Sequence, residues 1–277
     1  MKSGNHLAPA LVTHAALAAA GAIVIIPFLW IGAAAFKTQI ALLTGTLTFT
    51  PTFANMNELL FSKTSEYLHN FGNSLIVAVL STVMVLVIAT LAAHAIVRRR
   101  APTWVIHSLL GWSIAFHIIP PITMASAWFA MFRAVGLENT LSGLVLAHIT
   151  LHLPMALWLM CVFVREVPVE LEEAAFIDGA SAPQLFMSVV VPLVRPGLAA
   201  AGILTFIFSW NEFAVALNLT QKATATVPVA IAKYAQEYEI KYTEMAAGAL
   251  LSVLPAIVIL LLGQRHIVRG LTAGAIK

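Results

Sequence analysis

The chain has 277 residues, of which 60% are hydrophobic and only 10% are Asp, Glu, Lys or Arg. Soluble globular proteins average about half apolar and about a quarter charged residues, so this composition and a mean hydropathy of +0.92 exclude an ordinary soluble domain. The formal net charge of +3 reflects basic residues near the ends of apolar segments, and nothing in it indicates nucleic-acid binding.

Six apolar segments are long enough to cross a bilayer, because about 20 helical residues span about 30 Å of hydrocarbon. We expect an all-α, polytopic helical membrane protein that forms one compact domain over residues 1–277. The first segment has the flanks of a secretory signal, but its apolar run is about twice a signal's core of about 7–15 residues, so we expect a retained anchor helix. The predicted spans are 11–36, 71–97, 104–132, 141–164, 197–219 and 244–264.

Two short patterns inside these spans carry structural predictions. Pro120 and Pro121 predict a kink or break in the third span, since a proline ring cannot continue an unbroken helix. Ala89 and Ala93 form a small-xxx-small pair, which is typical of helices that pack closely in membranes.

The basic residues predict the orientation, because they are retained preferentially on the cytoplasmic side. The triplet Arg98–Arg100 has the most weight, since it lies directly at a predicted helix end. It places both termini and the loop at 166–197 in the cytoplasm. Nine basic residues then lie on that side and six on the other: Lys2, Arg98, Arg99, Arg100, Arg165, Arg195, Arg265, Arg269 and Lys277 against Lys37, Lys63, Arg133, Lys222, Lys233 and Lys241.

The loop at 166–197 holds an unusual share of the chain's carboxylates. A short helix is predicted from Pro168, with three glutamates near its N-terminus, where the helix dipole favours anions. Gly179 can take the positive φ that ends a helix. From charge alone this is an ordinary acidic loop between spans. The residues in question are Glu170, Glu172 and Glu173, with Leu171, Ala174 and Ala175 expected to share one apolar face.

The full string of this loop resembles the EAA signature of permease subunits of binding-protein-dependent ABC importers. The matching residues are Glu173, Ala174, Ala175, Gly179, Val189, Val191 and Pro192, with Val in places where Ile or Leu is usual. The fuller string is similar to the carbohydrate-uptake branch, in particular the second permease of the maltose-importer type. Three further segments resemble the same branch: Asn73-Ser74-Leu75, Trp210-Asn211-Glu212-Phe213, and residues 264–277.

The resemblance implies a type I ABC importer permease fold with six transmembrane helices, both termini cytoplasmic, in the inner membrane of a prokaryote. It makes the EAA segment a coupling helix that docks on an ATPase, through Glu173, Ala174, Ala175, Asp178 and Gly179. The implied partners are a homologous second permease, an ABC ATPase dimer, an extracytoplasmic solute-binding protein, membrane lipid, and a sugar or sugar-like solute. No cofactor is expected on this chain, which lacks a GxxxxGK[ST] loop; ATP and Mg²⁺ would be held by the ATPase subunits.

Polar residues inside the predicted spans are candidates for the solute pathway, because polar groups in hydrocarbon tend to face a cavity or a partner. Glu212, with Asn211 and Trp210 beside it, has two readings. The carboxylate, amide and indole suit a sugar ligand, whereas Glu212 alone suits a conformational lock that pairs with another helix. His148 and His152 have the four-residue spacing of metal ligands, but without a third ligand nearby we expect hydrogen bonds between helices.

Two other classes of protein are alternatives to the importer permease. A self-sufficient secondary transporter or channel would be expected to carry an ion-coupling site and often an internal repeat, and neither is visible in the sequence. A membrane-embedded enzyme would need convergent acid, base or metal ligands, and no such cluster can be read in the sequence. The external segments 37–70 and 220–243 are expected either to receive the binding protein or to cover the ends of the spans.

Overall fold

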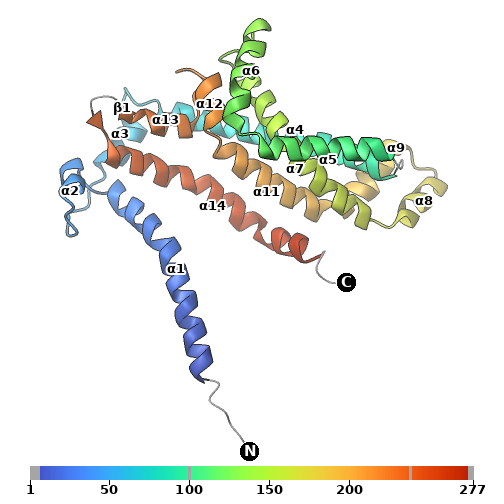
Figure 1. Ribbon diagram of the computed structural model, residues 1–277, viewed down its shortest axis with the longest axis horizontal. Coiled ribbons are helices and arrows are strands. Elements are labelled where there is room, and N and C mark those ends of the chain that lie inside the picture. The colour runs from blue at the N-terminus through green and yellow to red at the C-terminus, as the bar shows by residue number, and fades with distance from the viewer. Residues whose placement is uncertain (1–6, 99–100, 237–238, 274–277) are drawn as a thin grey trace, which may run out of the picture. The chain divides into compact units, whose positions relative to one another are not determined.

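The computed structural model describes the backbone of residues 7–98, 101–236 and 239–273, and the side chains of these residues except 7–11, 110, 117, 236, 239 and 264–273. It is nearly all helical, as the sequence predicts (Figure 1). The longer helices are α1 (Leu7–Ala35), α4 (Tyr67–Arg98), α5 (Thr103–Ile118), α6 (Pro121–Ala134), α7 (Leu141–Glu166), α11 (Arg195–Trp210) and α14 (Tyr242–Ala273).

The shorter elements lie in the links between these helices. They are α2 (Gln39–Leu43), α3 (Ala54–Phe61), α8 (Val169–Ile177), α9 (Ala182–Leu185), the π-helix η1 (Phe186–Val190), α10 (Val191–Leu193), α12 (Ala214–Leu219) and α13 (Val227–Lys233). In the described residues the only strands are β1 (Ala235–Gln236) and β2 (Glu239–Ile240), which pair antiparallel with Ala235 opposite Ile240.

Four helices are long and apolar enough to cross a membrane: α1 from Val12 to Ala35, α4, α7, and α14 from Tyr242 to Gly263. Two further helix pairs are each bent by more than 40°, and counting each pair as one span raises the number to six. The six predicted spans fall within this range. Prolines inside α1, α7 and α14 do not break these helices, in keeping with the tolerance of membrane helices for proline.

The two bent pairs owe their bends to prolines. Helices α5 and α6 meet at 103°, with Pro120 before the first residue of α6 and Pro121 as that residue, so the break predicted at this dipeptide is confirmed. The segment 182–193 meets α11 at 75°, and Pro196 lies in the first turn of α11. Proline suits a first helical turn, where its missing N–H leaves no hydrogen bond unmade.

The predicted fifth span differs from the observed one at its C-terminal end. A single helix was expected over 197–219, but α11 ends at Trp210 and α12 is a separate six-residue helix. The pattern of apolar residues does not predict this break, because α12 is also mostly apolar, like the helix before it. The hydrogen bonds that separate the two helices are described below with Glu212.

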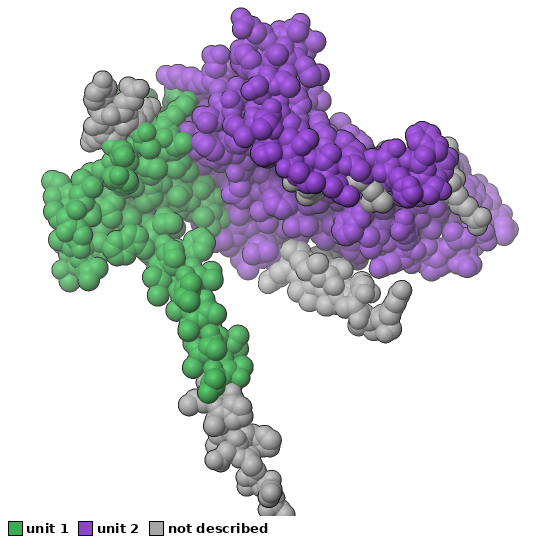
Figure 2. Space-filling view, in the orientation of Figure 1, with its two compact units in different colours: residues 1–68, 231–253 green, residues 69–230, 254–277 purple. Residues whose placement is uncertain are grey.

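Contacts between residues divide the chain into two compact units, coloured separately in Figure 2. Unit 1 comprises residues 1–68 and 231–253, and unit 2 comprises residues 69–230 and 254–277. The single domain over residues 1–277 that the sequence predicts stays a prediction. In unit 1, Lys37 is 2% exposed. Its ammonium donates to the carbonyl of Thr46 at 2.7 Å and lies 5.0 Å from the ring of Trp30, which together compensate for the burial of its charge.

Unit 2 is built on α4, α7 and α11. Ala89 and Ala93 of α4 are fully buried in one apolar cluster with Ala156 and Met160 of α7, as expected for close packing between helices. Gly197 of α11 lies against the ring of Phe163 in α7. A second apolar cluster gathers residues of α4, α6, α7 and α12. The polar groups described next therefore lie on a well-packed helical frame.

Candidate functional site

The first candidate site is the loop that contains α8. This helix begins after Pro168 and has Glu170 and Glu172 in its first turn. It ends at Ile177, followed by Asp178 and by Gly179, which has a φ of +84°. The N–H of Ala180 donates to the carbonyl of Ala175 at 3.0 Å, which closes the turn. The short helix predicted from Pro168 and its end at Gly179 are confirmed.

The predicted coupling residues lie mostly on the outside of this loop. Glu173, Ala174, Asp178 and Gly179 are exposed, and Ala175 is half-buried against the core of unit 2. Two large apolar side chains accompany them: Phe176 is 56% exposed and Ile177 is 86% exposed. The loop therefore presents a carboxylate, small residues and uncovered apolar groups side by side, and exposed apolar groups that lie together are typical of an interaction surface.

The face of α8 that packs against the protein is marked by a carboxylate. Leu171 and Ala174, two residues of the predicted apolar face, are exposed, and Leu171 is 45% exposed. The buried residue of α8 is Glu172. Hydrophobicity alone does not identify this position as the inner one, because it is taken by a paired carboxylate.

Glu172 forms a charged cluster with two residues of α4, here called the Glu172 cluster. Arg98 donates from Nε to Glu172 at 2.6 Å, and His94 Nε2 lies 3.0 Å from the other carboxylate oxygen. The Glu172 side chain is 8% exposed. A carboxylate buried to this extent needs such partners, because an unpaired buried charge is costly. Arg99 and Arg100, the rest of the predicted triplet, lie outside the described residues.

This cluster could not be assembled from the sequence alone. There Arg98 is a signal of orientation, Glu172 is one of three similar glutamates, and His94, like His148, is expected only to form a hydrogen bond between helices, which it does. The available signal was the four-residue spacing of His94 and Arg98, which puts both side chains on one face of α4. The sequence does not specify which acid that face meets.

The second candidate site is the segment 210–213, where α11 ends. Trp210 is 3% exposed and packs between aromatic rings, 5.9 Å from Phe206 and 5.3 Å from Phe71 between centroids. Asn211 is exposed, and its amide donates to the carbonyl of Ile207 at 2.9 Å. Of the three predicted pathway residues, Trp210 thus lies in the core, Asn211 lies outside it, and Glu212 joins the polar network described next.

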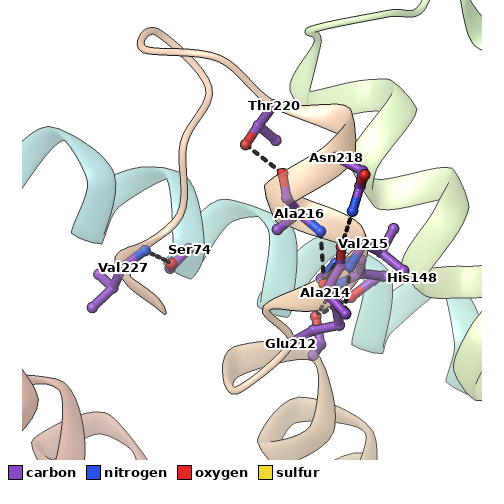
Figure 3. Close-up of polar contacts among 11 residues, drawn as sticks. Ser74, His148, Glu212, Ala214, Val215, Ala216, Asn218, Thr220 and Val227 are labelled. Carbon is purple, nitrogen blue, oxygen red and sulfur yellow. Dashed lines mark hydrogen bonds and ion pairs between the residues drawn. The ribbon is translucent and has the colours of Figure 1, made fainter. Parts of the chain in front are cut away.

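Glu212 receives hydrogen bonds from the first turn of α12 (Figure 3). Its two carboxylate oxygens accept the backbone N–H groups of Val215 at 2.8 Å and Ala216 at 2.9 Å. The first N–H groups of a helix have no partner within the helix, and an acidic side chain is a favourable acceptor for them. Glu212 therefore starts a new helix directly after α11, which is why the predicted span of 197–219 is divided.

A buried polar network connects this bend to two other helices. His148 of α7 lies 2.7 Å from Ser209 of α11 through Nδ1, and Ser209 lies 3.1 Å from Ser81 of α4. The other ring nitrogen of His148 lies 3.7 Å from Glu212. His152 packs its ring against Phe208. The expected hydrogen bonding between helices is confirmed for His148; within the described residues no group of three metal-ligating side chains is found.

Two other segments that resemble the family, at 73–75 and at 264–277, are described to different extents by the structure. Asn73 and Ser74, near the start of α4, hold residues 223–227. Asn73 Nδ2 donates to the carbonyl of Ala225 at 3.0 Å. Ser74 accepts the N–H of Val227 at 2.8 Å, as Figure 3 shows. The C-terminal match continues along the backbone of α14 to residue 273. Its side chains from 264 and residues 274–277 lie outside the described part of the chain.

The sequence and the fold were compared with known proteins. The model of a family described as "Binding-protein-dependent transport system inner membrane component" matches residues 86–273. The trehalose transport system permease protein SugB of Mycobacterium tuberculosis is 40% identical over 261 residues, which cover 91% of this chain and 92% of that one. The trehalose/maltose transport system permease protein MalG of Thermococcus litoralis is 31% identical over 258 residues, 92% of each chain.

One solved structure is similar over nearly the whole chain. It is a bacterial ABC transporter involved in the import of the acidic polysaccharide alginate, with a TM-score of 0.79 and 19% identity. The match covers 96% of this chain and 98% of the other. The likeness concerns the fold, and it agrees with the importer permease fold that the resemblance of the sequence implies.

Proposed function

The chain belongs to the family of binding-protein-dependent transport system inner membrane components, and we propose that it is the permease subunit of an ATP-driven importer for a sugar or sugar-like solute. The solute class rests on the relatives named as trehalose and trehalose/maltose permeases. A separate solute-binding protein delivers the solute, and a homologous second permease completes the pathway. This chain forms half of that pathway.

The exposed surface of α8 is the observation that carries the proposed coupling to ATP hydrolysis. Glu173, Ala174, Phe176 and Ile177 lie uncovered on it, and the positive φ of Gly179 turns the chain back sharply. An apolar and acidic helix of this kind suits a cleft with basic and apolar walls. The proposed partner is a dimer of ABC ATPases, which hold ATP and Mg²⁺, so this chain has no ATPase site.

The proposed orientation places α8 and both termini in the cytoplasm. It is supported by the position of Arg98 at the C-terminal end of α4, next to α8, since basic residues at helix ends are retained on that side. The loop at 223–227, held by the opposite end of α4, then lies on the external face. Six spans result when each bent helix pair crosses once.

For Glu212 the contacts support the role of a conformational lock rather than that of a sugar ligand. Both of its oxygens already accept hydrogen bonds from α12, and His148 lies beside one of them. Trp210 is enclosed by Phe71 and Phe206, which supports a packing role. We propose that the segment 210–213 sets the shape of the pathway helix and leaves solute selection to other residues.

Purification of the tagged chain from its native membrane in mild detergent tests the proposed function. We expect an ABC ATPase and a second permease to co-purify, with ATPase activity that rises when a loaded solute-binding protein is added. The ligand of that binding protein then identifies the solute. A chain that purifies alone and supports solute flux in vesicles without ATP would instead be a self-sufficient secondary transporter or channel.

A further inference from the structure

The attachment of α8 to α4 is concentrated in a few polar contacts. A cavity of about 850 Å³ lies beside the Glu172 cluster, lined by Leu91 and Ala95 of α4, Phe176 of α8 and Phe186 of η1. Apolar side chains of α4 and α8 therefore face each other across open volume rather than in continuous contact. The short hydrogen bonds of the Glu172 cluster join the two helices directly, beside the apolar cluster in which Ala175 of α8 takes part.

Arg98 holds the loop at two points. Besides its bond to Glu172, it donates from Nη2 to the carbonyl of Val167 at 2.7 Å. Val167 directly follows the last residue of α7, and it is 6% exposed. One guanidinium thus fixes both the corner between α7 and α8 and the first turn of α8. Charge-assisted bonds of this kind are shorter and stronger than neutral ones, so α8 is held to α4 in one orientation.

The opposite end of α4 holds a different loop with a similar density of bonds. His69 Nε2 lies 2.8 Å from the carbonyl of Ala223. Asn73 and Ser74, both buried, hold Ala225 and Val227 as described above. In Figure 1, α8 lies near one end of α4 and α12, which leads into this loop, lies toward the other. From residue 74 to residue 98 a helix rises about 36 Å, which exceeds the thickness of the hydrocarbon core.

We propose that α4 transmits displacement of α8 to the loop at 223–227 on the opposite face, with His94 and Arg98 as positioning residues. The inference rests on the proposed docking of α8 on an ATPase. Because the Glu172 cluster fixes α8 to α4, a push on α8 moves α4 with it. Because Asn73 and Ser74 fix the loop to the same helix, that motion reaches residues 223–227. A nucleotide-driven event on one face is thereby linked to the face that receives solute.

Distances between spin labels in the assembled transporter test this proposal. Labels on Glu170→Cys in α8 and Leu91→Cys in α4, both at exposed positions, are placed in a Cys161→Ala background. Pulsed dipolar measurements are made without nucleotide and with ATP trapped by vanadate. We expect one unchanged distance in the parent chain, and a distance that shifts or broadens on trapping when Glu172→Gln is added. A third label on Gln221→Cys should change its mobility on trapping in the parent chain only.

The coupling is measured in the same preparations by the stimulation of ATPase activity with a loaded binding protein. Glu172→Gln and Arg98→Lys should lower that stimulation by about 2- to 30-fold, the range for residues that carry coupling between sites, while the ATPase still co-purifies. Arg133→Gln is the matched control, because Arg133 pairs with Glu138 at 3.8 Å at a 73% exposed site. It should change neither readout.

The outcomes separate this inference from the proposed function. Unchanged label distances and unchanged stimulation in Glu172→Gln and Arg98→Lys, with the ATPase bound, would overturn the role of α4 and leave the importer assignment intact. If Glu172→Gln fails to assemble, Arg98→Lys and His94→Gln decide, since each leaves one partner of Glu172 in place. Absence of any ATPase from the unmodified complex would overturn both proposals.

Discussion

Glu212 lies 3.7 Å from His148 Nε2, so the end of α11 is connected to α7. The same carboxylate caps α12 through the N–H groups of Val215 and Ala216. One side chain therefore fixes a helix start and a contact with a neighbouring helix. Both carboxylate oxygens are therefore already in use within the protein. A structural role of Glu212 and a role as a sugar ligand lead to different predictions for its variants.

Replacement of Glu212 by alanine removes both acceptors from the start of α12. Loss of a capping side chain typically costs about 0.5–2 kcal/mol, so we expect a lower thermal unfolding midpoint in detergent and a lower maximal rate of uptake. Glu212→Gln keeps one oxygen that can accept and should lie between the parent and Glu212→Ala. A weaker solute affinity with unchanged stability would instead identify Glu212 as a sugar ligand.

The hydrogen bond between His148 and Ser209 links α7 to α11 and is fully buried. A double-mutant cycle with His148→Ala and Ser209→Ala should give a coupling energy near the average of about 0.6 kcal/mol for such bonds in membrane proteins, and at most about 1.7 kcal/mol. Thr150→Ala is the control on α7, because its hydroxyl donates to Leu146 in its own helix. The cycle of Thr150→Ala with Ser209→Ala should be additive. Additive effects in the His148 cycle would contradict the contact.

Local signals account for what could be predicted from the sequence. The start of α8 at Pro168, its end at Gly179 and the break at Pro120 follow from residues that restrict their own backbone. The long apolar runs locate α4 and α7 for the same reason, since each run reports its own surroundings. None of these features depends on which other segment lies nearby.

The misses concern residues whose role is decided by a distant segment. Glu170, Glu172 and Glu173 have similar local signals, and Glu172 is the buried one because Arg98 and His94 of α4 lie against its position. Trp210 reads equally well as a sugar platform or as a core residue, and Phe71, far away in the sequence, completes its packing. Pairings of this kind are set by the tertiary fold, which a single sequence does not specify.

Gly179 has a left-handed backbone, with φ at +84°, and a Cβ built on it meets nothing within 4 Å. Strain rather than crowding therefore decides the effect of a substitution. Gly179→Val should cost roughly 1–2 kcal/mol locally, distort the end of α8 and reduce recovery of the ATPase, while membrane insertion stays normal. Gly179→Asn is the matched control, because Asn tolerates this conformation. Equal recovery with both variants and with the parent would remove the docking role of this turn.

Ala174 lies exposed on α8 between the uncovered Glu173 and Phe176. A partner that packs closely on this surface leaves no room for a large side chain, so Ala174→Trp should abolish co-purification of the ATPase without lowering the stability of the chain. Ala174→Ser keeps the side chain small and should bind as the parent does. Retained ATPase binding by Ala174→Trp would show that the docking surface lies elsewhere.

Gly197 tests the packing of α11 on α7. A Cβ built on Gly197 overlaps the ring of Phe163, and Phe163 belongs to the main apolar cluster of unit 2. Gly197→Ala should therefore lower the free energy of unfolding by about 1–3 kcal/mol, the usual cost of overpacking. Gly72→Ala in α4 is the control, because nothing lies within 4 Å of its added Cβ and alanine favours a helix over glycine by roughly 0.5–1 kcal/mol. A Gly197→Ala chain as stable as Gly72→Ala would mean that α11 does not approach α7 this closely.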